Sequence, residues 1–365
     1  MKNSLLYTVL RAYVKFCSKL YFNRIEIHGL DNIPKKGPVI LTANHQNAFL
    51  DAILIHITQP RSPHFLTRGD VFKNPLAKRI LRSLKMRPIF RFRDGLANVK
   101  KNKGTFSECY DILESGLALG VFPEGNHDLK FHLRPLQKGT ARIVYDTEAR
   151  NNFELNIAIV PVGVQYYGNQ NAQSDVLIQF GEPILSSEFV EFKNDEKTYH
   201  QALTERIKAK MSKLIIDIPL ENYDRVKRKW LMSRKHYTPL NEVFEKDKAA
   251  INEDKYDFSE ANGPWYKWLV ALFAAYGLLN HMFIYPFYKW FVHKITREDE
   301  FLGSFKFVLG IVIIPMLYML QTFAFYPILG NWSGVYFILL PISGIAFRKW
   351  LIKRLNKIWA ISYTA

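Results

Sequence analysis

A chain of 365 residues with 48% hydrophobic residues is long enough for two or three domains and a sizeable core, and this composition excludes intrinsic disorder for most of it. The formal net charge of +17 predicts an acidic partner, either nucleic acid or an anionic membrane surface. The two cysteines, Cys17 and Cys109, exclude a disulfide scaffold and a four-thiolate zinc site.

Residues 1–24 have the pattern of an amphipathic helix, with apolar side chains at helical spacing and basic side chains on the opposite face. Arg11 and Lys15 interrupt the uncharged run that a secretory signal needs, so we do not expect a signal peptide. Two positions for this helix stay open. It docks on the protein core, or it lies on anionic lipid, where Tyr13 and Phe16 suit an interface.

Within an expected domain of residues 25–222, short apolar runs alternate with helical patterns from about Ile33 to Ile184. The expected strands are Val39–Ala43, His64–Thr67, Pro88–Phe90, Leu117–Phe122, Ile157–Val164 and Val176–Phe180. The expected helices are Phe49–Ile57, Val71–Leu84, Asn98–Leu113 and Lys138–Thr147. This alternation predicts an α/β domain with a mostly parallel sheet flanked by helices. In such sheets chemistry lies where the strands end.

Residues 223–262 are polar and are predicted to be a helical connector, and residues 263–365 are predicted to be a helical membrane region with a basic tail. No formal charge occurs from Phe307 to Phe347 or from Trp268 to Tyr288. Apolar segments of about 18 residues or more are candidates for membrane spans. A wholly soluble protein is therefore not expected.

Basic residues at both ends of 307–347 favour a hairpin that turns near Gly330–Gly334 and keeps both ends in the cytoplasm. Trp265–Val292 would then cross alone and place residues 25–222 outside. A re-entrant or interface-lying segment broken near Pro286 resolves this conflict, and so does a failure of the charge rule for the short loop. We expect the α/β domain to face the cytoplasm at the inner membrane.

Residues 61–103 hold 13 Lys and Arg but only Asp70 and Asp94 as acids, a net charge of +11. Because the same chain has membrane segments, we expect attraction to acidic headgroups, about 1 kcal/mol for each basic residue near the surface. Nucleic acid is the rival partner. The sequence contains no groove-reading motif or metal finger, so we expect no nucleic-acid binding.

A histidine and an aspartate follow the strand Val39–Ala43, with Asn47 as the expected N-cap of the next helix. A histidine that acts as a base needs a hydrogen-bonded carboxylate to fix its tautomer. In one continuous helix, His45 and Asp51 would lie about 120° apart around the axis. Their pairing therefore requires His45 to precede the helix.

Two further motifs lie at the ends of strands. Glu124 follows a strand and would share a sheet edge with His45, and Gly125 lets a backbone N–H approach a ligand closely. Arg91 and Arg93 alternate with apolar neighbours and offer forked guanidinium groups that suit phosphate. Taken singly, these motifs are also typical of an ordinary turn and of surface cations on an edge strand.

Four blocks follow one another within roughly residues 25–215: Asn44-His45 with Asp51, Ile89-Phe90-Arg91, Phe122-Pro123-Glu124-Gly125 and Val160-Pro161-Val162. In this order they resemble the blocks of the glycerolipid acyltransferases, the PlsC-type lysophosphatidate and glycerol-3-phosphate acyltransferase family. The resemblance implies an α/β acyltransferase domain. It implies transfer of a fatty acyl chain from acyl-CoA or acyl-carrier protein to the hydroxyl of a glycerophosphate acceptor, 1-acylglycerol 3-phosphate, in phospholipid synthesis.

The resemblance also implies roles for single residues. His45 is implied to be the general base and Asp51 the residue that orients it. Arg91 is implied to bind the acceptor phosphate, with Arg93 as the second candidate. The other residues implied to hold substrate are Asn44, Glu124, Gly125 and Pro161. No metal, cofactor or covalent acyl-enzyme is implied, so we interpret Cys109 as a small core residue.

Two departures from the family pattern bear on the substrate. Five residues separate His45 and Asp51, whereas four are commonest. The longer spacing resembles the fungal glycerol-3-phosphate and dihydroxyacetone-phosphate acyltransferases, so those acceptors stay open, as does remodelling of another lysophospholipid. Asn126-His127-Asp128 stands where Thr or Ser with Arg often follows, and Arg134 or Lys138 is a candidate to replace that arginine.

Two other classes of function are compatible with the same residues. A metal-dependent hydrolase could use His45, Asp51, Glu124, His127 and Asp128 as ligands, although they lack the regular spacing of a strong metal motif. A non-enzymatic basic membrane scaffold would carry these blocks by accident. Metal dependence of activity separates the first from an acyltransferase, and the effect of His45→Ala on cellular function separates the second.

Overall fold

The structure is a computed structural model that describes residues 5–90, 102–168, 170–233, 239–256, 267–296 and 298–362. The chain forms two compact units. Unit 1 comprises Met1–Lys15, Glu26–Tyr166 and Val176–Leu220, and unit 2 comprises Phe16–Ile25, Tyr167–Asp175 and Glu221–Ala365. Almost all of the β-sheet belongs to unit 1, and the C-terminal helices belong to unit 2.

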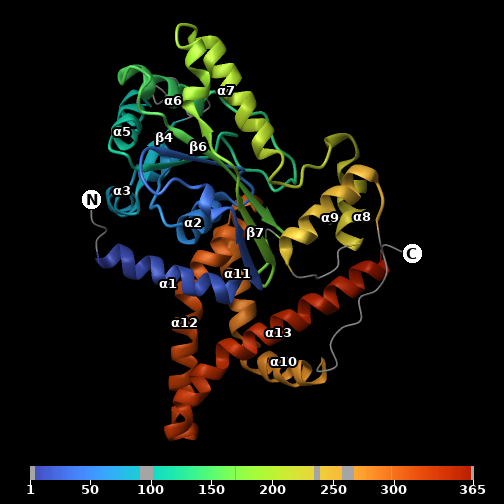
Figure 1. Ribbon diagram of the computed structural model, residues 1–365. Coiled ribbons are helices and arrows are strands. Elements are labelled where there is room, and N and C mark those ends of the chain that lie inside the picture. Colours follow the sequence, from blue (N-terminus) through green and yellow to red (C-terminus); the bar gives the residue numbers. More distant parts are fainter. Residues whose placement is uncertain are drawn as a thin grey trace. The chain divides into compact units, whose positions relative to one another are not determined.

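An eight-stranded sheet has the order β1-β7-β6-β2-β5-β3-β4, with β8 paired to β6 (Figure 1). The strands are β1 (Arg24–His28), β2 (Val39–Ala43), β3 (His64–Arg68), β4 (Met86–Ile89), β5 (Ala118–Val121), β6 (Ala158–Tyr166), β7 (Asp175–Phe180) and β8 (Ile184–Leu185). β2 runs parallel to β5 and β6, and β3 runs parallel to β4 and β5, whereas β7 and β8 run antiparallel to β6. The prediction of a mostly parallel sheet is confirmed.

Helices of unit 1 flank this sheet (Figure 1). They are α2 (Ala48–Thr58), α3 (Pro75–Ser83), α5 (Asn102–Glu114), α6 (Gly139–Arg150) and α7 (Glu196–Met211), with the 3-10 helices η1 (Leu30–Asn32), η2 (Gly69–Phe72) and η4 (Ser186–Phe192). Leu119 of β5, Cys109 of α5, Val144 of α6 and Leu203 of α7 are fully buried together. Cys109 is thus a core residue, as predicted, and burial raises the pKa of its thiol to about 12.

The central strand β2 shows a sequence pattern from which the sheet could be predicted. All five residues of Val39–Ala43 are buried, because parallel strands flank this strand on both sides and helices cover it.

The expected helix Val71–Leu84 is instead two elements, η2 and α3. Pro75 begins α3, because proline has no N–H to continue an earlier helix but suits a first helical turn.

The N-terminal helix α1 (Leu5–Tyr21) is amphipathic, as expected. Its first half packs on unit 1, where the Tyr7 hydroxyl hydrogen-bonds His56 and Arg11 donates to the Gln59 carbonyl over 2.5 Å. Docking on the core, one of the two open positions, is therefore observed. Apolar side chains on another face of the helix, such as Leu5 and Val9, are exposed.

Unit 2 is helical. Its helices are α8 (Tyr223–Ser233), α9 (Leu240–Glu253), α10 (Lys267–His281), α11 (Ile284–Ile295), α12 (Leu302–Leu329) and α13 (Ser333–Ser362), with η6 (Asp299–Phe301) and η7 (Gly330–Trp332), while η5 (Leu220–Asn222) spans the boundary between the units. Among the described residues, Asp299–Arg348 is the one helical stretch long and apolar enough to cross a membrane, by length and composition. The chain turns within it at η7, where the sequence predicts a turn.

Candidate functional site

The turn between β2 and α2 places His45 ahead of the helix. Asn44 fixes this turn, because its side-chain amide donates to the Val164 carbonyl over 3.1 Å and accepts the Val164 N–H over 2.7 Å. Ala48, the first residue of α2, has a left-handed backbone with φ of 43°. The chain therefore bends sharply before α2, and the His45 ring returns to the first turn of that helix.

His45 and Asp51 form the hydrogen-bonded pair that the sequence predicts. Nδ1 of His45 lies 2.8 Å from Oδ2 of Asp51, and the Asn47 N–H donates to the same oxygen over 2.8 Å. Since a carboxylate only accepts, Nδ1 carries the proton and Nε2 is the acceptor of the neutral ring. The side chain of Asp51 is fully buried, whereas 15% of the His45 side chain is exposed. The pair can therefore take a proton from a hydroxyl that reaches Nε2.

Aromatic rings fix the orientation of the imidazole. Phe122 stacks on His45 with ring centroids 4.0 Å apart, and His127 meets it edge-on at 5.5 Å. The loop that carries His127 is held to the His45 turn, because the Asp128 N–H donates to the His45 carbonyl and the Gln46 amide donates to the Lys130 carbonyl. The ends of β2 and β5 thus form one rigid edge.

Glu124 braces this edge from β5. Its Oε1 accepts the His45 N–H over 2.8 Å, and its Oε2 accepts from Nε of Arg134 over 2.8 Å. Burial raises the pKa of Glu124, and the charge of Arg134 and hydrogen bonds to Arg134 and His45 lower it in part. Gly125 closes a turn onto the Phe122 carbonyl with φ of 71°, a left-handed conformation that glycine adopts without strain.

Comparison with known proteins matches residues 24–165 to the family described as Acyltransferase. Residues 24–165 belong to the Acyltransferase family. This acyltransferase domain contains all four predicted blocks, Val160-Pro161-Val162 included, together with the His45–Asp51 pair.

Curated relatives match parts of the chain. Glycerol-3-phosphate O-acyltransferase 2 of Saccharomyces cerevisiae is 30% identical over 84 residues, which are 23% of this chain and 11% of that protein. A 1-acyl-sn-glycerol-3-phosphate acyltransferase of Borreliella burgdorferi is 25% identical over 180 residues, 47% of this chain and 70% of that protein. The chain thus spans only about a tenth of the yeast relative. A solved structure of the 1-acyl-sn-glycerophosphate acyltransferase PlsC from Thermotoga maritima has 19% identity and a TM-score of 0.40, and the likeness covers 56% of this chain and 78% of that one.

The remaining predicted site residues fall in different places. Pro161 lies inside β6, where it pairs in register with Thr42 of β2. Arg91 and Arg93 lie outside the described residues. The described residues on either side of them are joined, because the Asn102 side chain accepts the Phe90 N–H over 2.9 Å and donates to the Phe90 carbonyl over 2.6 Å.

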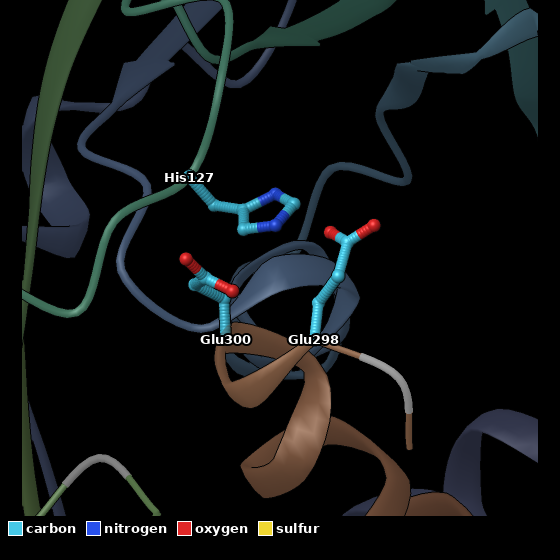
Figure 2. A group of neighbouring side chains, drawn as sticks. All are labelled: His127, Glu298 and Glu300. Carbon is cyan, nitrogen blue, oxygen red and sulfur yellow. The ribbon is translucent and has the colours of Figure 1, made fainter. Parts of the chain in front are cut away.

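The ligand set of the rival metal site is not assembled as metal ligands within the described part of the acyltransferase domain. Both oxygens of Glu124 are occupied by hydrogen-bond donors. One group with metal-ligand spacing occurs among the described residues, His127 with Glu298 and Glu300 (Figure 2). His127 belongs to unit 1 and the two glutamates belong to unit 2, so neither unit contains this group.

Sequence reasoning missed one partner of the pair. Tyr166, at the end of β6, donates its hydroxyl to Oδ1 of Asp51 over 2.7 Å. Its signal was weak, because a tyrosine that ends an apolar strand is usually a core residue. The choice between Arg134 and Lys138 as the replacement for the missing arginine stays a prediction, although the two side chains differ in their surroundings. Arg134 pairs with Glu124, whereas Lys138 is exposed.

Removing the cation beside Glu124 is expected to destabilise the domain. Arg134→Gln should lower the free energy of unfolding at pH 7 by about 3 kcal/mol, because it leaves a buried carboxylate without its counter-ion. Without Arg134 the pKa of Glu124 rises further above its usual value. A raised folded-state pKa favours the protonated form, so the loss is largest above that pKa and shrinks as pH falls toward about 4.3, the unfolded-state value.

Urea unfolding of the wild type and of Arg134→Gln at two pH values, near neutral and near 5, measures this. Lys138→Gln is the matched control, because it removes one exposed cation four residues away. It should change the free energy of unfolding little at either pH. An equal loss for Arg134→Gln at both pH values contradicts the assignment of the effect to Glu124.

Proposed function

We propose that this chain is a glycerolipid acyltransferase that moves a fatty acyl chain from acyl-CoA or acyl-carrier protein to the hydroxyl of 1-acylglycerol 3-phosphate. The observation that carries the proposal is the His45–Asp51 pair, whose geometry leaves Nε2 of His45 as a proton acceptor at the sheet edge. The family of the domain and the acceptor in the name of the Borreliella relative support the same reaction.

The proposed reaction proceeds in one displacement at the thioester. His45 Nε2 takes the proton of the acceptor hydroxyl as its oxygen attacks the thioester carbonyl carbon. Asp51 stabilises the imidazolium that forms. The carbon–sulfur bond then breaks, and the leaving thiolate takes the proton from His45, which gives an ester and a free thiol. No protein thiol is needed, in keeping with the burial of Cys109.

The other predicted residues receive supporting roles. Arg91 and Arg93 are proposed to bind the acceptor phosphate, since guanidinium groups suit its oxygens. Glu124 and Gly125 are proposed to shape the acceptor site, Glu124 by holding the backbone of His45. Asn44 and Pro161 are proposed to fix the wall of the site through the pairing of β2 with β6.

Glycerol 3-phosphate is the second candidate acceptor. Two observations favour it: the five-residue spacing between His45 and Asp51, and the match to a protein named glycerol-3-phosphate O-acyltransferase. Dihydroxyacetone phosphate and other lysophospholipids are further acceptors to include in a test.

The deciding experiment is acyl transfer by detergent-solubilised protein. Acyl-CoA and acyl-carrier protein are each offered with 1-acylglycerol 3-phosphate, glycerol 3-phosphate and dihydroxyacetone phosphate, and His45→Ala protein purified in parallel is the blank. The proposal expects ester product from the wild type alone, most rapidly with 1-acylglycerol 3-phosphate. Faster product with glycerol 3-phosphate would replace the acceptor, and no product with any pair would overturn the assignment.

We also propose that unit 2 anchors the protein in an anionic membrane, with the acyltransferase domain on the cytoplasmic side. The support is the apolar stretch Asp299–Arg348, most of whose side chains are not buried inside the protein, together with the net charge of +17. A long acyl chain is nearly insoluble in water, so a membrane location would let the product leave laterally into the bilayer.

Charges placed in the apolar stretch should weaken the anchor. Leu320 and Phe323 of α12 are 64% and 80% exposed. Leu320→Lys with Phe323→Lys is expected to shift the protein from the membrane pellet to the supernatant, because each lysine costs about 3 kcal/mol at the centre of a span. Leu220→Lys, at an exposed apolar residue outside the stretch, is the control and should stay in the pellet. Equal sedimentation of both variants contradicts the anchor.

A further inference from the structure

We infer that Tyr166 is a positioning residue of the proposed acyl transfer: its buried hydroxyl sets how strongly Asp51 holds the proton on His45. The inference rests on the proposed function, since it deepens the role of the same pair. The sequence motifs predict His45 and Asp51 as site residues. Tyr166 belongs to none of these motifs and contacts Asp51 only because the chain folds β6 beside the His45 turn.

Tyr166 reaches Asp51 because β6 is longer than its neighbour. β2 ends at Ala43, which pairs with Val162, and β6 continues for four more residues. That continuation extends about 13 Å past the end of β2, alongside the turn that holds His45. β7 supports the extension, where Tyr166 pairs with Val176, and the Asn44 side chain ties the turn to Val164. The hydroxyl is thus held in place by the sheet.

Asp51 receives three hydrogen bonds in a fully buried environment. Oδ2 takes Nδ1–H of His45 and the N–H of Asn47, and Oδ1 takes the Tyr166 hydroxyl over 2.7 Å. Both Asp51 and Tyr166 have no exposed surface. A carboxylate removed from water needs such donors to remain ionised, and hydrogen bonds to a charged group are among the strongest in proteins.

The three donors share one negative charge. The phenol draws part of that charge toward Oδ1, so the attraction of Oδ2 for the imidazolium of His45 is reduced. Without the phenol, Asp51 should hold the proton on His45 more tightly, and His45 would be protonated, and inactive as a base, up to a higher pH. Tyr166 would therefore weaken the hold of Asp51 on the proton of His45.

Tyr166→Phe tests this, because it keeps the ring and removes only the hydroxyl. Tyr199→Phe is the matched control: Tyr199 is equally buried in unit 1, and its hydroxyl has no hydrogen-bond partner within the described residues. Two readouts are compared for the wild type and both variants: kcat/KM for acyl transfer from about pH 5 to 9, and an NMR titration of the His45 ring.

We expect Tyr166→Phe to lower kcat/KM about tenfold near neutral pH, the size of one hydrogen bond to a charged group. The midpoint of the acidic limb and the NMR midpoint of His45 should both move to higher pH, whereas Tyr199→Phe should match the wild type. The other titratable groups described around the ring are Asp51, His127 and Glu124, and neither variant alters them.

A second substitution keeps the test decisive should Tyr166→Phe fold poorly. Site-specific 3-fluorotyrosine at position 166 keeps the hydroxyl and makes it a stronger donor, so the His45 midpoint should move to lower pH. Unchanged midpoints in both substituted proteins overturn the inference, even where activity falls. Wild type that is inactive with every substrate pair overturns the proposed function instead, while the NMR midpoints still decide whether Tyr166 controls His45.

Discussion

Replacing His45 with Ala is expected to lower kcat/KM for acyl transfer by about 10³-fold, within the range of about 10²–10⁴ that positioned general bases contribute. The structure gives the reason. Nδ1 of His45 is tied to Asp51, its ring is stacked on Phe122, and Nε2 is therefore presented in one orientation. Binding of the acyl donor should change little, so the loss should appear in kcat rather than in KM.

The control for this variant is His28→Ala. His28 also pairs with a carboxylate, Glu26, at 2.7 Å, but it lies on β1, at the opposite end of the strand order from β4 and three places from β2. That variant should keep wild-type kcat. Added imidazole should restore part of the activity of His45→Ala, because the small base can enter the space against Phe122. Full activity without His45 would remove the base from the mechanism.

The sequence predicts the fold correctly where a strand is buried on both faces and therefore appears as an uninterrupted run of apolar residues. β2 is buried on both faces, so its apolar run Val39–Ala43 stands out, and its parallel partners follow from alternation with helices. The direction of β7 was also readable in principle. Only residues 167–174 connect β6 to β7, and this is shorter than the crossover that a parallel strand requires.

The sequence predicts the site residues that lie in short motifs at the ends of strands. His45 and Glu124 end neighbouring parallel strands, so topology alone brings them to one edge. Tyr166 was not readable, because it is 115 residues from Asp51 and meets it only through the extra length of β6. The pairing of Arg134 with Glu124 likewise depends on how the loop after Gly125 folds, and the spacing of apolar residues in the sequence does not predict the path of a loop.

Asp51→Asn is expected to lower kcat/KM by about 10²–10³-fold while leaving the fold and the His45 tautomer intact. The Asn47 N–H and His45 Nδ1–H both donate to Oδ2, so an amide oxygen is the atom that fits there. The amide NH₂ then faces the Tyr166 hydroxyl, which can turn and accept. The loss would therefore come from the missing charge, and it stays below the about 10⁴-fold loss that accompanies a wrong tautomer.

Because Tyr166 acts through the charge of Asp51, the effects of substituting these two residues on kcat/KM should be coupled. A double-mutant cycle measures this coupling. In wild-type protein, Tyr166→Phe removes a donor from a charged group. In Asp51→Asn protein, residue 51 carries no charge for the Tyr166 hydroxyl to stabilise. The same substitution, Tyr166→Phe, should therefore change kcat/KM less than about twofold. Nitrogen NMR of His45 in Asp51→Asn should still place the proton on Nδ1. A proton on Nε2, or equal effects of Tyr166→Phe in both backgrounds, would mean that Asp51 acts by fixing the tautomer and that Tyr166 acts separately from it.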